Sequence, residues 1–177
     1  AETLTEAVGN SCNPVQIQLA LKMGKDTYYD YLEMFGITQK TNVDLPAETS
    51  AIIQDKDAIG QVELSTMAYG HGIAVTPIQL AAAVCAIGND GVLMQPRVVK
   101  ELRDSDGDTV KTFETKEVRK VISSKTADEM RSIMEYVVSE GGGGNAKIAG
   151  YRIGGKTGTA DKVVNGKYSS DTYSSFI

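Results

Sequence analysis

The chain has 177 residues, of which 41% are hydrophobic and 23% are charged, and these fractions are typical of a folded globular protein. Its formal net charge is −5 and no cluster of lysines or arginines offsets it, which argues against a nucleic-acid-binding protein. The longest apolar run, residues 73–87, is interrupted by polar residues and falls short of the roughly 20 residues that a membrane span needs.

Histidine and cysteine are scarce, which excludes several kinds of catalytic and metal-binding site. His71 is the only histidine, so a Ser-His-Asp triad and a multi-histidine zinc site are excluded, and a structural role in its loop is expected. Cys12 and Cys85 are too far apart in sequence for a short metal motif, and two free thiols are favoured over a disulfide. We therefore expect no metal and no cofactor.

The first long helix is predicted to begin with Asn13 as the N-cap and Pro14 at the first helical position. Residues 15–23 alternate between apolar and polar, which is typical of a strand. The Asn-Pro start, the Gly24 stop and the strong helix formers between them favour a helix instead, buried on more than one side.

A second helix is predicted from a cap at Asp26 to a stop at Gly36. Its core-facing stripe consists of Tyr28, Tyr31, Leu32 and Phe35. Residues 37–62 then have the composition of a loop.

The clearest helix start in the chain follows that loop. Thr76 and Gln79 have the spacing of a capping box, with Pro77 in the first turn, and Gly88 ends the helix.

Strand-like sequence comes next. Residues 98–99 and 110–113 flank an acidic, glycine-containing stretch, 104–108, which is predicted to be a hairpin turn. Another helix is predicted to begin around residues 124–126, with Thr126 and Glu129 as its capping box, and four successive glycines end it. The apolar face of this helix consists of Ala127, Met130, Ile133, Met134, Val137 and Val138.

Two final strands are predicted over residues 151–164 and 168–177. They are joined by Asn165-Gly166, the strongest short hairpin signal. No strand–helix–strand alternation occurs anywhere in the chain. The sequence therefore predicts an α+β fold in which an antiparallel sheet is flanked by helices.

The strongest candidate for a binding or catalytic site is Gly-Gly-Lys-Thr-Gly-Thr-Ala, residues 154–160. Its lysine, threonines and glycines are suited to binding a carboxylate or a phosphate. Residues 150–157 match the phosphate-binding pattern G-x-x-x-x-G-K-[ST] letter for letter. That pattern requires a helix directly after it, whereas here the chain continues into an Asn-Gly turn. Nucleotide binding is therefore disfavoured, and a plain edge strand with an exposed lysine is the remaining simple alternative.

A second short motif favours a functional site at the lysine over a plain edge strand. Ser11-Cys12-Asn13 is a Ser-x-Asn tripeptide, and it lies upstream of the Lys-Thr-Gly that begins at Lys156. The serine enzymes that react with penicillin carry these two motifs in this order. Each motif is weak alone, but the ordered pair is considerably more specific.

With these motifs, the chain resembles the transpeptidase domain of class B penicillin-binding proteins. The resemblance rests on residues 9–14, 69–79 and 150–160 and extends over essentially the whole chain. The middle segment is similar to division- and sporulation-type members. The resemblance implies the fold shared with serine β-lactamases, with the lysine motif on an inner strand of the sheet.

The resemblance also implies three catalytic roles. Ser11 would relay a proton toward the leaving nitrogen. Asn13 would hydrogen-bond the substrate's peptide amide, although it is also credible as a helix cap. Lys156 would assist the proton relay and attract the substrate carboxylate.

Three further residues of the lysine motif are implied to bind the substrate. The hydroxyls of Thr157 and Thr159 would hold the terminal carboxylate, and the Thr159 N–H would complete an oxyanion hole. Gly158 would let the substrate lie along the strand.

One departure from the family pattern is important. The family's nucleophile is the serine of a Ser-x-x-Lys motif, and no lysine of this chain has a serine three residues before it. We therefore expect residues 1–177 to be part of a transpeptidase domain, with no second domain, that is inactive alone. The parent protein would be anchored at the outer face of the bacterial cytoplasmic membrane by an N-terminal segment.

The implied partners are peptidoglycan stem peptides ending in D-Ala-D-Ala, and β-lactams, with no nucleic acid. Self-association through an exposed sheet edge is also expected. Two alternatives remain open: a β-lactam-recognising hydrolase or sensor domain, and a non-catalytic binding module.

Overall fold

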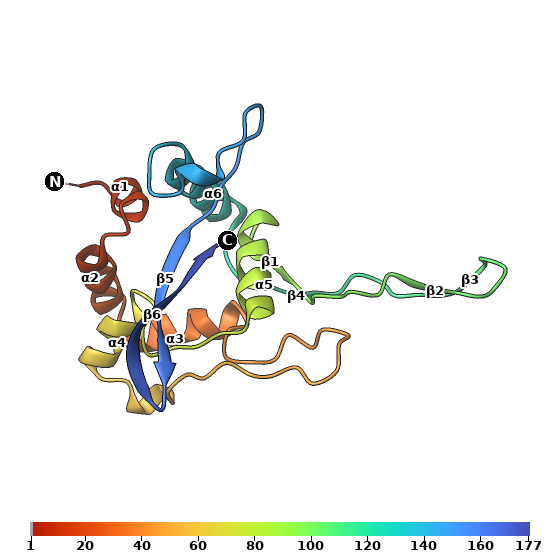
Figure 1. Cartoon of the computed structure of the whole chain (residues 1–177), viewed down its shortest axis with the longest axis horizontal. Helices are drawn as coiled ribbons and strands as arrows, with labels where there is room; N and C mark the ends of the chain where they lie inside the picture. Colours follow the sequence, from red (N-terminus) through yellow and green to blue (C-terminus); the bar gives the residue numbers. More distant parts are fainter. Residues whose placement is uncertain (1) are drawn as a thin grey trace. The chain divides into compact units, whose positions relative to one another are not determined.

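Helices occupy most of the first half of the chain, and short antiparallel ribbons occupy much of the second. The structure is a computed structural model that describes residues 2–177 (Figure 1). The chain forms two compact units, each built from segments that are separated in sequence. The first comprises the residues up to Tyr28 together with Gln54–Ile73 and Asp128–Ile177, and the second comprises Tyr29–Ile53 and Ala74–Ala127.

The first unit contains the elements that carry both short motifs. Its helices and strands are α1 (Leu4–Gly9), α2 (Asn13–Met23), η1 (Lys56–Ala58), α4 (Gln61–Met67), η2 (Gly144–Ala146), β5 (Thr157–Val164) and β6 (Lys167–Phe176). The second unit contains α5 (Pro77–Gly88), β1 (Val92–Met94), β2 (Glu101–Arg103), β3 (Thr109–Thr112) and β4 (Glu117–Lys120). Two helices, α3 (Lys25–Met34) and α6 (Ser124–Ser139), have residues in both units.

All strand pairs are antiparallel, so the predicted α+β class is confirmed. Within the described residues, β1 pairs with β4, β2 with β3, and β5 with β6. The strands thus form three separate two-stranded ribbons. The lysine motif was expected on an inner strand of the sheet. Among residues 2–177, however, its strand β5 pairs only with β6, so β5 is an edge strand in this part of the chain.

The start of α5 is the prediction that the structure confirms most fully. Thr76 Oγ1 accepts from the Gln79 N–H at 3.2 Å, and Gln79 Oε1 accepts from the Thr76 N–H at 3.0 Å. Gln79 is only 1% exposed, and its Nε2 donates to the carbonyls of Ile37 and Gln39. One side chain therefore both caps α5 and fixes the loop after α3, with its polar atoms satisfied in the core.

The predicted start of α6 around residues 124–126 is confirmed, but the capping residues predicted for α2, α3 and α6 were wrong by one to three residues. Cys12, not Asn13, is the N-cap of α2, and Asp26 is already inside α3. At α6, Ser123 Oγ accepts from the Thr126 N–H at 3.0 Å, so Thr126 is a helical residue and not the cap. At α6 the Ser123 hydroxyl supplies the capping acceptor, whereas α2 begins without a side-chain cap.

The prediction that α2 is buried on more than one side was also wrong. Ala20 is its only buried residue, while Leu19, Leu21 and Met23 are 38–45% exposed. Alternation spreads apolar residues around the whole circumference of a helix. One neighbouring helix, α4, therefore covers only part of them.

The two predicted hairpin turns are present. Asn165 and Gly166 both have positive φ (51° and 74°), which is the geometry of a type I′ turn between β5 and β6. The turn at 104–108 joins β2 to β3. Residues 98–99 were predicted to belong to the first strand of that hairpin, but this strand, β2, begins at Glu101. The amides of Val98 and Val99 donate instead to the Asp44 carboxylate, at 2.7 and 2.9 Å.

Buried apolar residues lie in the second unit and along α6. In the second unit Ala86, Leu93 and Val121 are buried together, with Met34 and Phe35 packed against them. The predicted apolar face of α6 is confirmed: Ala127, Val137 and Val138 are buried, and Met130, Ile133 and Met134 are half-buried.

Candidate active site

Ser11 is held in a left-handed backbone conformation at the end of α1. The Cys12 N–H donates to the Ala7 carbonyl at 2.8 Å and the Ser11 N–H to the Val8 carbonyl at 3.2 Å, which is the Schellman pattern. The position with positive φ in this motif is usually glycine, but here it is Ser11, with φ 53°. A non-glycine residue pays about 1–2 kcal/mol for this conformation, so the hydroxyl is placed there at a cost in stability.

The end of α1 packs closely on α6. A Cβ atom on Gly9 would lie 2.8 Å from Cε1 of Tyr136, so only glycine allows this approach. The Gly142 N–H donates to the Gly9 carbonyl at 3.2 Å, which ties the glycine loop after α6 to the same point. These contacts fix the position of Ser11, two residues further along the chain.

The lysine motif begins with an equally close approach. A Cβ on Gly155 would lie 2.6 Å from the Ile177 carbonyl oxygen and 2.3 Å from Cζ of Phe176. The next residue, Lys156, exchanges both backbone hydrogen bonds with Ile177, at 2.8 and 3.2 Å. Gly155 therefore lets the chain start to pair with the end of β6 directly before the lysine.

The side chains of the two motifs meet at Lys156. Its Nζ donates to Ser11 Oγ at 2.5 Å and to the Thr157 carbonyl at 2.9 Å, and lies 3.4 Å from Thr157 Oγ1. Lys156 is half-buried, and the loss of water around it lowers the pKa of its ammonium group below the ordinary value for lysine. The structure thus brings together Ser11, Lys156 and Thr157, three of the residues named from the motifs.

The backbone of β5 presents an open edge beside this lysine. Because Lys156 and Ile177 form a hydrogen-bonded pair, Thr157 and Thr159 occupy the alternate pairs, which are not hydrogen-bonded. The register has no irregularity before Asp161. The N–H and C=O groups of both threonines therefore point away from β6, toward the free edge of β5.

The remaining predicted residues lie around this edge. A Cβ on Gly158 would lie 2.8 Å from Ser175 Oγ on the paired strand, so a larger residue there would require the Ser175 hydroxyl to move. The side chains of Thr159 and Asn13 are exposed, and neither makes a hydrogen bond to another residue in the range 2–177. Asn13 is the first residue of α2, so its amide is available to a ligand rather than used as a cap.

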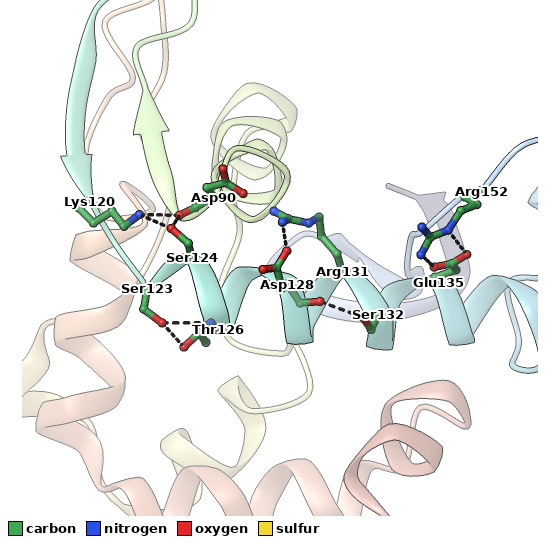
Figure 2. A network of polar contacts seen from close by, with 10 residues as sticks. All are labelled: Asp90, Lys120, Ser123, Ser124, Thr126, Asp128, Arg131, Ser132, Glu135 and Arg152. Carbon is green, nitrogen blue, oxygen red and sulfur yellow. Dashed lines mark hydrogen bonds and ion pairs between the residues drawn. The ribbon is translucent and has the colours of Figure 1, made fainter.

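Sequence reasoning did not find two side-chain contacts in the unit that carries the site. His71 lies in its loop between two aromatic rings, with ring centroids 5.1 Å from Tyr69 and 5.3 Å from Tyr168 on β6. Arg152 forms a two-pronged ion pair with Glu135 of α6 (Figure 2). The Tyr-Gly-His-Gly stretch hints at the first contact, but no local pattern indicates the second.

The arrangement is suited to carboxylate chemistry. A cation, a serine hydroxyl and outward-facing backbone groups can bind an anionic peptide end and move a proton. The chain continues from Thr157 as a strand and not as a helix, so the amide cradle of a phosphate-binding loop is missing. Both cysteines are free, and within residues 2–177 there is no cluster of three metal-ligating side chains and no helix long and apolar enough to span a membrane.

Comparison with known proteins shows the family. A sequence model described as the penicillin-binding protein transpeptidase domain matches residues 1–177. The chain belongs to this family. Stage V sporulation protein D of Bacillus subtilis is 43% identical over 97% of the chain, and the peptidoglycan D,D-transpeptidase FtsI of Escherichia coli K12 is 36% identical over 94% of it. The chain spans only 27% of the length of each.

Solved transpeptidase structures match the fold. Apo penicillin-binding protein 3 of Mycobacterium tuberculosis has a TM-score of 0.90 at 31% identity, over 99% of this chain and 41% of that one. The same protein has been solved in complex with aztreonam and with ampicillin. The transpeptidase domain of penicillin-binding protein 3 from Burkholderia pseudomallei gives a TM-score of 0.85 at 30% identity, over 99% of this chain and 51% of that one. The transpeptidase fold predicted from the motifs is confirmed.

The strain at Ser11 can be measured by comparing two substitutions that both remove the hydroxyl. Glycine adopts positive φ without strain and alanine does not, so Ser11→Gly should unfold at a temperature about 2–4 °C above Ser11→Ala, equivalent to ~1 kcal/mol. Differential scanning calorimetry makes the comparison. Equal or reversed melting temperatures would show that residue 11 is unstrained.

Proposed function

We propose that the complete protein containing these residues is a D,D-transpeptidase that cross-links peptidoglycan stem peptides during division or sporulation. The observation that carries the proposal is the hydrogen bond from Lys156 to Ser11, placed beside the open edge of β5. Residues 1–177 would all belong to its transpeptidase domain. The chain's family and the names of its relatives support the same reaction class.

The chemistry would be acyl transfer through a covalent intermediate. A serine from a Ser-x-x-Lys segment outside these residues attacks the carbonyl between the two D-alanines, the terminal D-alanine leaves, and the amine of a second peptide then attacks the ester. The Ser11 hydroxyl, which accepts from Lys156, can pass a proton to the departing nitrogen. The Ser11 oxygen takes up the proton that the attacking serine releases, so the relay leaves Ser11 neutral, and Lys156 donates a hydrogen bond to it throughout.

Substrate binding would use the lysine motif and α2. The terminal carboxylate lies against the hydroxyls of Thr157 and Thr159 and the charge of Lys156. The outward-facing N–H of Thr159 donates to the developing oxyanion, and a typical donor of this kind contributes about 2.7–4 kcal/mol. Gly158 keeps the strand clear of side chains, and the Asn13 amide binds the peptide group of the substrate.

We infer the ligands and location from the same reaction. The substrates are stem peptides ending in D-Ala-D-Ala, and β-lactams would imitate them and stop at the acyl stage. The complexes of a related protein with aztreonam and ampicillin support this inference. Peptidoglycan is assembled outside the cytoplasmic membrane, so the site would face outward, and the parent protein would be anchored there.

The first test labels the complete protein with a fluorescent penicillin. Lys156→Ala should slow acylation by roughly 10²–10³-fold, the range for loss of one preorganised electrostatic group at an active site. The matched control is Lys162→Ala on the same strand, where the ammonium lies 4.8 Å from the ring of Tyr173 and outside the site. The control should label at the wild-type rate.

The same experiment separates the alternatives. A stable acyl-enzyme supports the transpeptidase, whereas a label that is released within a few turnovers would indicate a hydrolase. No label in the complete protein would indicate a non-catalytic module. Wild-type labelling of Lys156→Ala would overturn the role of the lysine.

We also propose that the isolated 177-residue chain self-associates through the free edge of β5. This edge exposes unpaired backbone groups, which favour pairing with another strand. Sedimentation velocity over a concentration series should show a dimer that increases with concentration. A monomer at every concentration would contradict this proposal.

A further inference from the structure

The chain that leads into the lysine motif is attached to α6 by an ion pair. Arg152 Nε and Nη2 donate to the two carboxylate oxygens of Glu135, at 2.8 and 2.6 Å (Figure 2). This fork-to-fork geometry defines the orientation of both side chains as well as their distance. The pair therefore restrains where the chain runs, four residues before Lys156.

The backbone after Arg152 lies on the same turn of α6. The Gly155 N–H donates to the Met134 carbonyl at 3.1 Å. A Cβ on Gly154 would lie 3.2 Å from the Met134 side chain and 3.3 Å from the Glu135 nitrogen. The two glycines thus let the chain touch the helix, but they also make this segment intrinsically flexible, so it depends on outside contacts for its position.

The next residue of α6 supports the opposite side of the site. Tyr136 is the side chain against which Gly9 packs, and Gly9 leads through the turn of Schellman type to Ser11. Three consecutive residues of one helix, 134–136, therefore contact the segments that carry both Lys156 and Ser11. A single turn of α6 thus supports both halves of the site.

We propose that this turn of α6 sets the geometry between Ser11 Oγ and Lys156 Nζ, and that Glu135 and Arg152 are positioning residues for the reaction. This inference rests on the proposed transpeptidase function. The ion pair holds the flexible segment before Lys156 in a fixed position on α6, and the segment that carries Ser11 packs on the same turn of this helix. Neither side chain touches the reacting atoms, so both act through Lys156.

The exposure of the pair distinguishes positioning from simple stabilisation. The Arg152 side chain is 86% exposed and that of Glu135 is 33% exposed. Ion pairs this accessible to water contribute little to folding. Breaking the pair should therefore leave the fold intact and release only the segment before Lys156. Displacements of about 1 Å in a catalytic group can cost as much as 100-fold in rate.

The test measures the two steps of penicillin acylation separately in the complete protein by stopped-flow fluorescence. Glu135→Gln and Arg152→Gln should each reduce the acylation rate constant by roughly 10- to 100-fold, while the initial dissociation constant changes little. The double variant should be no slower than either single variant, because both break the same contact. Their melting temperatures should stay within about 4 °C of the wild type.

Two further variants make the result specific. The exchanged pair Glu135→Arg with Arg152→Glu should recover most of the rate. The matched control is Asp128→Asn, which removes an ion pair with Arg131 on the same helix without contacting residues 152–156 (Figure 2). It should acylate at the wild-type rate.

The outcomes separate this inference from the function on which it rests. Slow acylation of Lys156→Ala with normal acylation of Glu135→Gln and Arg152→Gln would overturn the positioning role alone. Normal acylation of Lys156→Ala would overturn the proposed function itself. A fall in melting temperature that accounts for the lost rate, without recovery in the exchanged pair, would show a purely structural ion pair and would also reject the inference.

Discussion

The hydrogen bond between Lys156 and Ser11 is the contact on which the site depends. It joins two segments that are 145 residues apart in the chain, and each is positioned by its own packing. Gly9 brings the serine segment against α6, and Gly155 brings the lysine segment against the end of β6. Both approaches need a missing Cβ, so the two glycines specify the site as much as the reactive side chains do.

This geometry lowers the stability of the folded protein in two ways. Ser11 occupies a backbone conformation that suits glycine, and Lys156 loses water around its charge, which lowers its pKa. Because the folded-state pKa lies below the ordinary lysine value, this desolvation costs the folded protein stability at low pH, and the cost is lost as the pH rises to the ordinary lysine pKa. Strain and partial burial at adjacent polar groups are a pattern often found at functional sites.

The predictions that succeeded depend on residues close together in sequence. The capping box of Thr76 and Gln79 and the Asn165-Gly166 turn are each specified within four residues, and both are present. The motifs at Ser11 and Lys156 also identified the residues that meet in the structure. The antiparallel α+β class followed from the order of these elements.

The predictions that failed depend on partners further away. Asn13 was assigned as a cap because no local sign shows that α1 ends in a turn of Schellman type immediately before it. Residues 98–99 look like a strand, but their amides are taken by Asp44, more than fifty residues upstream. The pairing of Glu135 with Arg152 also joins distant residues, and Arg152 stands at an unspecified position of the pattern at 150–157, so the sequence does not indicate this partner.

The most direct test of the account is a crystal structure of the complete protein after reaction with a penicillin. The account predicts an ester to a serine outside these 177 residues, with the ligand along the free edge of β5. Its carboxylate should contact the hydroxyls of Thr157 and Thr159, and Ser11 Oγ should lie between Lys156 Nζ and the acylated serine. A ligand bound elsewhere, or an acylated site in which Lys156 and Ser11 have separated, would contradict it.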